Sequence, residues 1–231
     1  MIEVNPRASR TIPFLSKCLG HSLAKLASKV LIGNSLRDLG FSSEIVPTSY
    51  AVKAPVFPFN KFLKVDPILG PEMKSTGEVM GRGSTFGEAF GKAIKAAGDE
   101  IPTRGNIFVS VKDSDKKYLP ELCQKFIELG FNIKATKGSC KFLADKGIRV
   151  EKVNKVLEGR PHIVDEILNN EICMVINTTE GRQSIKDSFS IRRSALEHST
   201  FLTTTISGGF AIAESLEKPS NEWNYIPLQT S

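Results

Sequence analysis

The sequence predicts an α/β protein in which the second half of the chain forms a doubly wound parallel sheet. Over residues 106–217, short runs of β-branched and aromatic residues alternate with segments whose apolar residues repeat every three or four positions. This alternation is typical of a parallel sheet with helices on both faces. Residues 1–100 lack it, and we expect a mixed α+β arrangement there.

The first 100 residues contain three predicted helices and one predicted strand. Ser22 and Thr85 are typical helix N-caps, and Gly33 and Gly98 follow the corresponding apolar patterns, where a left-handed residue is favoured. We expect a strand at residues 1–5 and helices at residues 22–32, 36–39 and 85–97. Between the last two helices, prolines exclude long helices and interior strands: Pro47, Pro55, Pro58, Pro67 and Pro71.

After a linker at residues 101–105, five strands and five helices are predicted in alternation. Gly130 is placed to end the first of these helices. The strands are expected at residues 107–111, 131–135, 150–156, 172–177 and 201–205. The helices are expected at residues 116–129, 139–145, 162–168, 184–196 and 210–216.

Composition excludes several classes of function. The chain has 231 residues and a formal net charge of +6, and no apolar run approaches the roughly 20 residues that a membrane-spanning helix needs. Its four cysteines and three histidines are dispersed, which argues against a disulfide framework or a zinc site and favours a reduced, cytoplasmic protein. One tryptophan and three tyrosines offer little stacking surface for nucleic acid. We therefore expect no nucleic-acid or membrane partner, and small phosphorylated ligands fit the charge better.

Hydroxyl, amide and basic groups follow three of the predicted strands. Ser110 lies at the end of the first strand and Lys116 follows it, and Thr136 and Ser139 follow the second strand. The fourth ends in Asn-Thr-Thr at residues 177–179. Since the carboxyl ends of parallel strands meet at one edge, these groups would form a cradle for phosphate. The same residue types also cap helices as ordinary structure, so both interpretations stay open for any single residue.

Six short motifs carry a family resemblance. They are Glu-Val-Asn-Pro-Arg-Ala-Ser-Arg at 3–10, Pro-Phe-Asn-Lys-Phe at 58–62, Gly-Pro-Glu-Met-Lys-Ser-Thr-Gly-Glu-Val-Met-Gly at 70–81, Gly-Arg-Pro-His at 159–162, Asn-Thr-Thr at 177–179 and Ile-Arg-Arg-Ser-Ala at 191–195. In this order they resemble the C-terminal part of the carbamoyl phosphate synthetase large subunit. The resemblance implies three parts: a truncated ATP-grasp synthetase domain at 1–100, a methylglyoxal-synthase-like allosteric domain at 106–217 and a loosely ordered tail at 218–231.

The resemblance implies that the first motif belongs to an ATP-grasp active site, which uses ATP and Mg²⁺ or Mn²⁺ in the intact enzyme. Glu3 and Asn5 would share the metal ions, since Mg²⁺ prefers hard oxygen ligands. Arg7 and Arg10 would hold the carbamate-type intermediate and the transferred phosphoryl oxygens. The lobes that grip ATP would lie upstream, so we expect the chain alone to hold neither ATP nor metal tightly and to be inactive. Apolar surface of residues 1–100 is then expected to be exposed.

The resemblance also implies a nucleotide-effector site, with uridylate as inhibitor and inosinate as activator. Lys116 and Lys155 would pair with the effector phosphate, and hydroxyl and amide groups would contact phosphate, ribose or base. The implied protein partners are the remaining synthetase lobes and the glutaminase small subunit. The matching positions are Ser110, Lys116, Thr136, Ser139, Lys155, Asn177, Thr178 and Thr179.

Several functional interpretations stay open. The chain is a regulatory module, a part of an active synthetase completed in trans, a stand-alone phosphate-binding module or a gene remnant. A methylglyoxal synthase activity is disfavoured, because residues 159–162 lack the carboxylate of that enzyme's Gly-Gly-Asp loop, and His162 is expected to pack or hydrogen-bond. Ornithine activation is disfavoured too, since Ala54 and Leu202 replace the family's Glu and Tyr.

Overall fold

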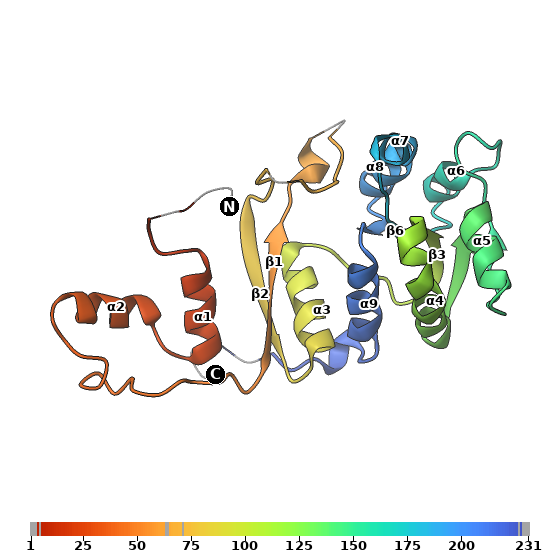
Figure 1. The fold of residues 1–231 in the computed structure, drawn as a ribbon. Helices are drawn as coiled ribbons and strands as arrows, with labels where there is room; N and C mark the ends of the chain where they lie inside the picture. The colour runs from red at the N-terminus through yellow and green to blue at the C-terminus, as the bar shows by residue number, and fades with distance from the viewer. Residues whose placement is uncertain (1–3, 5, 63–64, 71, 226, 228–231) are drawn as a thin grey trace.

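A five-stranded parallel sheet organises the second half of the chain (Figure 1). The computed structural model describes residues 4, 6–62, 65–70, 72–225 and 227. The strand order is β5-β4-β3-β6-β7. The first strand of this half, β3, is central, and the later strands are added outward on both sides, so the predicted doubly wound parallel sheet is confirmed. The strands are β3 (Gly105–Ser110), β4 (Phe131–Ala135), β5 (Glu151–Lys152), β6 (Met174–Asn177) and β7 (Phe201–Thr203).

Alternate residues of the central strand enter two separate apolar clusters. Ile107 and Val109 point to one face of the sheet and Phe108 to the other, and all three are fully buried. Helices α4, α5 and α9 contribute to the first cluster, and α6 and α8 to the second. Covering both faces is what a parallel sheet requires. These helices are α4 (Leu119–Glu128), α5 (Lys137–Ala144), α6 (Ile163–Leu168), α8 (Phe189–Glu197) and α9 (Ile206–Leu216).

Several elements of this half differ in extent from the prediction: α9 begins at Ile206, four residues earlier than expected, and β7 ends at Thr203. A 3-10 helix, η2 (Asp113–Tyr118), precedes α4 where a single helix from residue 116 was expected. The strand expected at 150–156 contains two residues, because β5 lies at the edge of the sheet and pairs with β4 alone.

The helix predicted at residues 184–196 is divided into α7 (Arg182–Asp187) and α8. The break is at Ser188, whose φ of −96° and ψ of 0° leave the α-helical region. At this break, Arg192 Nη2 donates a hydrogen bond to the Ile185 carbonyl at 2.7 Å. A side chain that turns inward to a backbone carbonyl thus accompanies the division of the helix.

The first half of the chain combines helices with an antiparallel pair of strands. The predicted helices at 22–32 and 85–97 are confirmed, with Ser22 Oγ accepting from Lys25 N at 3.4 Å and Thr85 Oγ1 from Glu88 N at 3.2 Å. The elements are α1 (Thr11–Leu19), α2 (Leu23–Leu31), β1 (Tyr50–Val56), η1 (Phe59–Lys61), β2 (Gly77–Gly83) and α3 (Phe86–Ala97).

One expectation for this half is wrong, and another falls mainly on residues outside the described ranges. The helix expected at residues 36–39 is wrong: these residues form a turn, closed by Phe41 N donating to the Leu36 carbonyl at 2.8 Å, because so short a segment cannot sustain a helix. The strand expected at residues 1–5 lies outside the described residues except for Val4, which is in no strand.

The β1–β2 pair was not predicted. Pro55 lies inside β1, and this is tolerated because both strands of a two-stranded sheet are edge strands. The assignment of residues 1–100 to an ATP-grasp domain stays a proposal.

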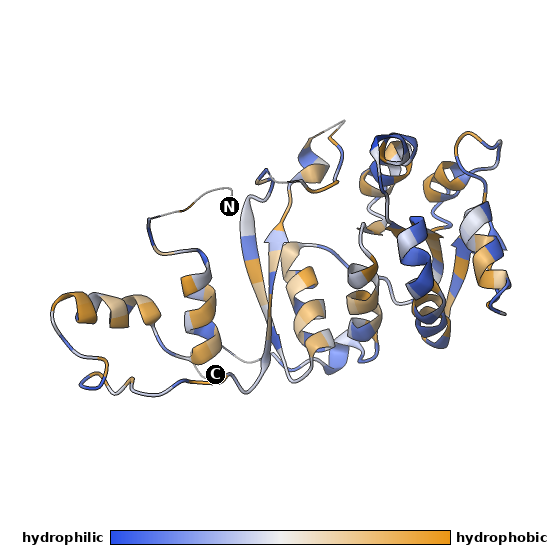
Figure 2. Cartoon of the chain, in the orientation of Figure 1, coloured by the Kyte–Doolittle hydropathy of each residue, from blue (hydrophilic) through white to orange (hydrophobic). Residues whose placement is uncertain are grey.

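Helices α1 and α2 expose apolar surface, as expected. Neither has a buried residue, although Figure 2 shows hydrophobic residues along both. Leu31 and Ile32 are 86% and 79% exposed. A groove of about 430 Å³ is lined by Leu23, Leu26, Ala27, Val30, Leu31, Leu36 and Phe41. No helix in the described part of the chain is long and apolar enough to cross a membrane.

Helix α3 joins the strand pair to the parallel-sheet half (Figure 1). On one side it lies so close to β2 that a Cβ on Gly81 would overlap the backbone of Ala89. On another side it lies against α9, where a Cβ on Gly87 would overlap the Glu214 backbone. Glycines at these contacts let the backbones approach, so α3 is packed between both halves of the molecule.

The buried carboxylate of Glu88 attaches the C-terminal segment to α3. It accepts hydrogen bonds from Lys92 Nζ at 2.7 Å, Ser84 Oγ at 2.9 Å and Asn224 N at 3.1 Å. Lys92 Nζ also donates to the Asn224 carbonyl. Burial alone would raise the pKa of Glu88, but the hydrogen bonds outweigh it and lower the pKa to about 2. Part of the tail expected to be loose therefore contacts α3, while the proposed domain boundaries stay predictions.

Acidification is expected to detach residues 218–225 from α3. Glu88 has a pKa of about 2 in the folded chain against an ordinary 4.5, so its contribution is complete above pH ~4.5 and is lost as the pH falls toward 2. This shift corresponds to stabilisation on the order of 3 kcal/mol. Fluorescence of Trp223, the single tryptophan, and hydrogen exchange of 218–225 would report detachment. The Glu88→Gln variant should lack this transition, and an unchanged acid response in it would contradict the assignment.

Candidate anion-binding site

The carboxyl ends of β3 and β6 meet where the strand order reverses. Ser110 and Asn177 are directly paired across these two strands. Because β4 lies parallel on the other side of β3, Thr136 reaches the same edge. Crevices outside such reversal points are the usual ligand sites of open α/β sheets. The structure thus brings the three predicted polar segments to one edge of the sheet.

The amino end of α5 offers unengaged hydroxyls at this edge. Thr136 is the N-cap residue, and its side chain makes no capping bond. Ser139, in the first helical turn, is 2% exposed. Within the described residues no side-chain oxygen is both fully buried and unpaired. Thr136 is 4% exposed, so both residues are nearly buried, and they lie beside the free N–H groups of a helix N-terminus.

The ammonium group of Lys116 lies beside the same helix end. Its Nζ is 3.8 Å from the position that a Cβ on Gly138 would take. It pairs with Asp113 Oδ1 at 2.6 Å, and this hydrogen bond, followed by the charge of Lys116, lowers the pKa of Asp113. The Asp113 side chain is 92% exposed, so the pair is weakened by solvent. An incoming phosphate can replace that carboxylate as the partner of Lys116.

Asn177 and Thr178 are engaged in bonds between strand ends. Thr178 Oγ1 accepts from Lys112 N at 3.1 Å, and Thr178 N donates to the Ser110 carbonyl at 3.1 Å. Asn177 Nδ2 donates to the same carbonyl at 3.4 Å, and its Oδ1 accepts from Arg192. These two residues therefore hold the shape of the edge in the chain without ligand.

Lys155 and Thr179 extend the edge on both sides. Lys155 is exposed in the turn after β5, where its backbone N donates to Glu158 Oε2 at 3.0 Å. Thr179 is half-buried. Lys112 Nζ, 3.8 Å from Glu180 Oε2, adds a third ammonium group to this edge. Positive charge, hydroxyls and backbone N–H groups suit an anion that also carries hydrogen-bonding groups.

His162 has a structural role. Its Nδ1 accepts from Asp165 N at 3.3 Å, and its own N donates to Asp165 Oδ2 at 3.0 Å, a reciprocal cap of α6. The predicted hydrogen-bonding role is confirmed, and the imidazole is occupied at the turn. This cap engages the Nδ1 of His162 in holding the start of α6.

The predicted synthetase residues lie in another part of the molecule. Arg7 and Arg10 are exposed, and Arg10 is the N-cap residue of α1, which Figure 1 places at the opposite end from β3 and β4. The predicted metal ligands Glu3 and Asn5 lie outside the described residues. Within the described ranges no cluster of three or more His, Cys, Asp or Glu side chains is arranged for a metal ion.

Sequence reasoning missed Arg192, whose side chain is fully buried. Its Nε and Nη2 donate to Asp66 Oδ1 and Oδ2 at 2.9 and 2.6 Å, and its Nη1 donates to Asn177 Oδ1 at 3.1 Å. The Arg-Arg pair at residues 192–193 stood among the family motifs and was the available signal. Nothing in the local sequence pointed to Asp66 as its partner, 126 positions away.

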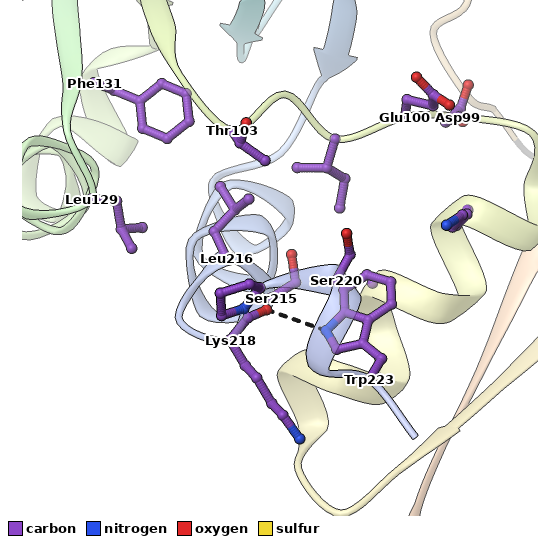
Figure 3. Close-up of a pocket in the computed structure, with 14 residues that line it drawn as sticks. Asp99, Glu100, Thr103, Leu129, Phe131, Ser215, Leu216, Lys218, Ser220 and Trp223 are labelled. Carbon is purple, nitrogen blue, oxygen red and sulfur yellow. Dashed lines mark hydrogen bonds between the residues drawn. The ribbon is translucent and has the colours of Figure 1, made fainter. Parts of the chain in front are cut away.

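A cavity of about 440 Å³ lies at the other edge of the sheet, by the amino ends of β3 and β4 (Figure 3). It separates the linker after α3 from α9 and the C-terminal segment. Trp223 forms one wall, with its Nε1 donating to the Lys218 carbonyl at 3.2 Å. Burial raises the pKa of Asp99 in this wall. The described lining includes none of the predicted site residues.

Comparisons with known proteins agree with the geometry. A family model described as an MGS-like domain matches residues 118–204. The large chain of carbamoyl phosphate synthase from Pseudomonas syringae pv. tomato is 58% identical over 217 residues, which are 94% of this chain and 20% of that protein. The sequence matches the C-terminal region of carbamoyl phosphate synthase large chains.

Other carbamoyl phosphate synthase large chains match the same share of this chain. Those of Xanthomonas campestris pv. campestris and Pasteurella multocida are 54% and 52% identical over 217 and 218 residues, again 94% of this chain and 20% of each relative. The chain thus spans about a fifth of the length of these relatives. The matched MGS-like domain contains six of the eight predicted effector residues and begins after Ser110 and Lys116.

Replacing Gly91 by alanine is expected to displace Trp223. A Cβ at Gly91 would lie 2.5 and 2.6 Å from Cη2 and Cζ2 of the indole ring, so the ring must move. We expect a red shift of the tryptophan emission and faster hydrogen exchange at residues 219–225. The matched control is Gly138→Ala, another helical glycine, whose added Cβ would lie 3.8 Å from Lys116 Nζ. An unshifted emission in Gly91→Ala would contradict this packing.

Proposed function

We propose that the chain acts as the regulatory end of a carbamoyl phosphate synthase large chain and binds a phosphorylated nucleotide effector at the strand ends. The observation that carries the proposal is the meeting of three polar strand ends beside the amino end of α5, with Lys116 Nζ next to Gly138. A helix N-terminus and an ammonium group in one place favour a phosphate.

The proposed ligand contacts follow from the positions of the groups. Phosphate oxygens would accept from the α5 backbone, from the hydroxyls of Thr136 and Ser139 and from the ammonium groups of Lys116 and Lys155. Ribose and base would contact the β3 and β6 ends. Ser110, Asn177, Thr178 and Thr179 are the groups there. Uridylate-type and inosinate-type effectors both carry the required monophosphate.

We further propose the role of the intact enzyme, which would make carbamoyl phosphate from bicarbonate and glutamine-derived ammonia for pyrimidine and arginine biosynthesis. It would use ATP with Mg²⁺ or Mn²⁺ and a glutaminase small subunit. Arg7 and Arg10 would then stabilise the transferred phosphoryl group, with Glu3 and Asn5 as metal ligands. Residues 1–100 alone hold too few groups to position ATP, so this polypeptide by itself is not expected to catalyse the reaction.

The first test is calorimetric titration of the chain with uridylate and with inosinate. Saturable binding is expected, weakened about 10- to 100-fold in Lys155→Met and Thr136→Val, since each removes a hydrogen bond to a charged group. Gly138→Val should weaken binding as well, because its side chain fills the space beside Lys116 Nζ.

The matched control for the lysine variant is Lys95→Met, since Lys95 lines the cavity at the far edge of the sheet. It removes the same charge from the chain and should bind both nucleotides like the unmodified protein. Absence of binding at millimolar nucleotide, or equal weakening by Lys95→Met, would overturn the proposed site.

A second candidate function is completion of a synthetase in trans, which the exposed groove on α2 favours. Apolar surface of this extent favours a partner, and the match covers only a fifth of the relatives' length, so the remainder of such a protein is the candidate partner. Mixing the chain with the remaining lobes should restore carbamoyl phosphate formation, and Leu26→Asp should reduce it at least tenfold. Lys29→Glu, an exposed charge change on the same helix, is the control. No activity on mixing would exclude this candidate.

A further inference from the structure

Arg192 connects the strand-end edge to the segment between β1 and β2. The guanidinium has 0% exposed side-chain area, and its bidentate partner Asp66 has 25%. Through Nη1 it also holds Asn177, the last residue of β6. One buried cation therefore bonds both to the candidate site and to a part of the chain outside the parallel-sheet half.

The segment that it holds is itself ordered around Asp66. Asp66 Oδ1 accepts from Ile68 N at 3.1 Å, and Lys74 Nζ donates to the Ile68 carbonyl at 2.9 Å. Arg193 Nη1 adds a bond to the Phe62 carbonyl at 3.2 Å. We call residues 65–70 the docking segment. The described hydrogen bonds that attach it to α8 come from Arg192, which also contacts the strand-end edge, whereas Arg193 bonds to Phe62 before the segment.

We propose that Arg192 couples anion binding at the strand ends to attachment of the docking segment, so that each favours the other. This inference rests on the proposed function, because it concerns regulation of that same site. The guanidinium is planar, and its donors have a fixed geometry. Bidentate pairing with Asp66 therefore sets the direction in which Nη1 meets Asn177.

The orientation of the Asn177 amide is the link to the ligand. With Oδ1 accepting from Arg192, Nδ2 is directed to the Ser110 carbonyl, 3.4 Å away. This bond joins the ends of β3 and β6, the strands at which the order reverses. When the docking segment leaves, a buried cation loses its carboxylate and must find other acceptors. The acceptors left to it are the Ile185 carbonyl at 2.7 Å and the Asn177 oxygen at 3.1 Å. Without Asp66 to fix the guanidinium, the Asn177 amide is no longer held in one orientation, so the edge loses the shape that receives the ligand.

Coupling of this kind is reciprocal. Attachment of the docking segment increases ligand affinity, and bound ligand increases the equilibrium constant for attachment of the segment by the same factor. A purely structural ion pair would change stability without making segment exchange depend on ligand. Ligand-dependent hydrogen exchange of residues 65–70 is therefore the measurement that separates the two roles.

The test uses the full chain with uridylate as the probe. Asp66→Asn should weaken uridylate binding about tenfold, a typical coupling factor. Saturating uridylate should slow exchange of residues 65–70 in the unmodified chain and leave it unchanged in the variant. The matched control is Asp187→Asn, an exposed carboxylate that accepts from Gln183 Nε2 at 2.7 Å, which should behave like the unmodified chain. Thermal unfolding is recorded for each.

Each outcome decides between the two proposals. If the unmodified chain does not bind uridylate, the proposed function fails and the coupling fails with it. If it binds and Asp66→Asn binds equally, with identical exchange at residues 65–70, the coupling alone is overturned. Should Asp66→Asn not fold, Asp66→Glu decides, since it keeps a carboxylate for Arg192 and lengthens the side chain that sets the bidentate geometry. A roughly two- to threefold loss of affinity supports the coupling, and no change overturns it.

Discussion

The structure depends most on one constraint: the guanidinium group of Arg192 is completely buried. Arg192 is surrounded by protein on α8, and a charge there is tolerated only when its donors are matched by acceptors. Asp66, Asn177 and the Ile185 carbonyl supply them. Three separate features follow: the segment after β1 is attached to α8, α7 is separated from α8, and the Asn177 amide has one orientation.

A second constraint is the close packing of α3 between its neighbours. Gly81 and Gly87 allow the helix backbone to approach β2 and α9, and Glu88 secures the C-terminal segment on the same helix. The parallel sheet, whose strand ends form the candidate site, is therefore part of a body in which α3 is packed on several sides. By contrast α1 and α2 contribute no buried residues. The molecule therefore combines a well-packed parallel-sheet half with an outer pair of helices that have no buried residue.

This division explains why a binding role is favoured over catalysis by the chain alone. The strand-end groups converge at one edge, whereas Arg7 and Arg10 are exposed near α1. Phosphoryl transfer needs positioning and charge neutralisation supplied together. The chain spans about a fifth of the length of the relatives that it matches. In the chain as described, the groups that converge are donors suited to holding an anion.

The sequence by itself determined the elements whose causes are local. Thr85 and Gly98 bound α3, Ser22 caps α2, and alternating apolar runs specify the parallel sheet, because these signals act within a few residues. Motif order was enough to recognise the matched family region. Only the tertiary structure decided the partner of Arg192, the pairing of β1 with β2 and the hydrogen bond from Asn224 N to the Glu88 carboxylate. Asp66 lies 126 positions from Arg192, and Asn224 lies 136 positions from Glu88. Contacts between such distant residues produce no periodic pattern in the sequence, because only folding brings the residues together.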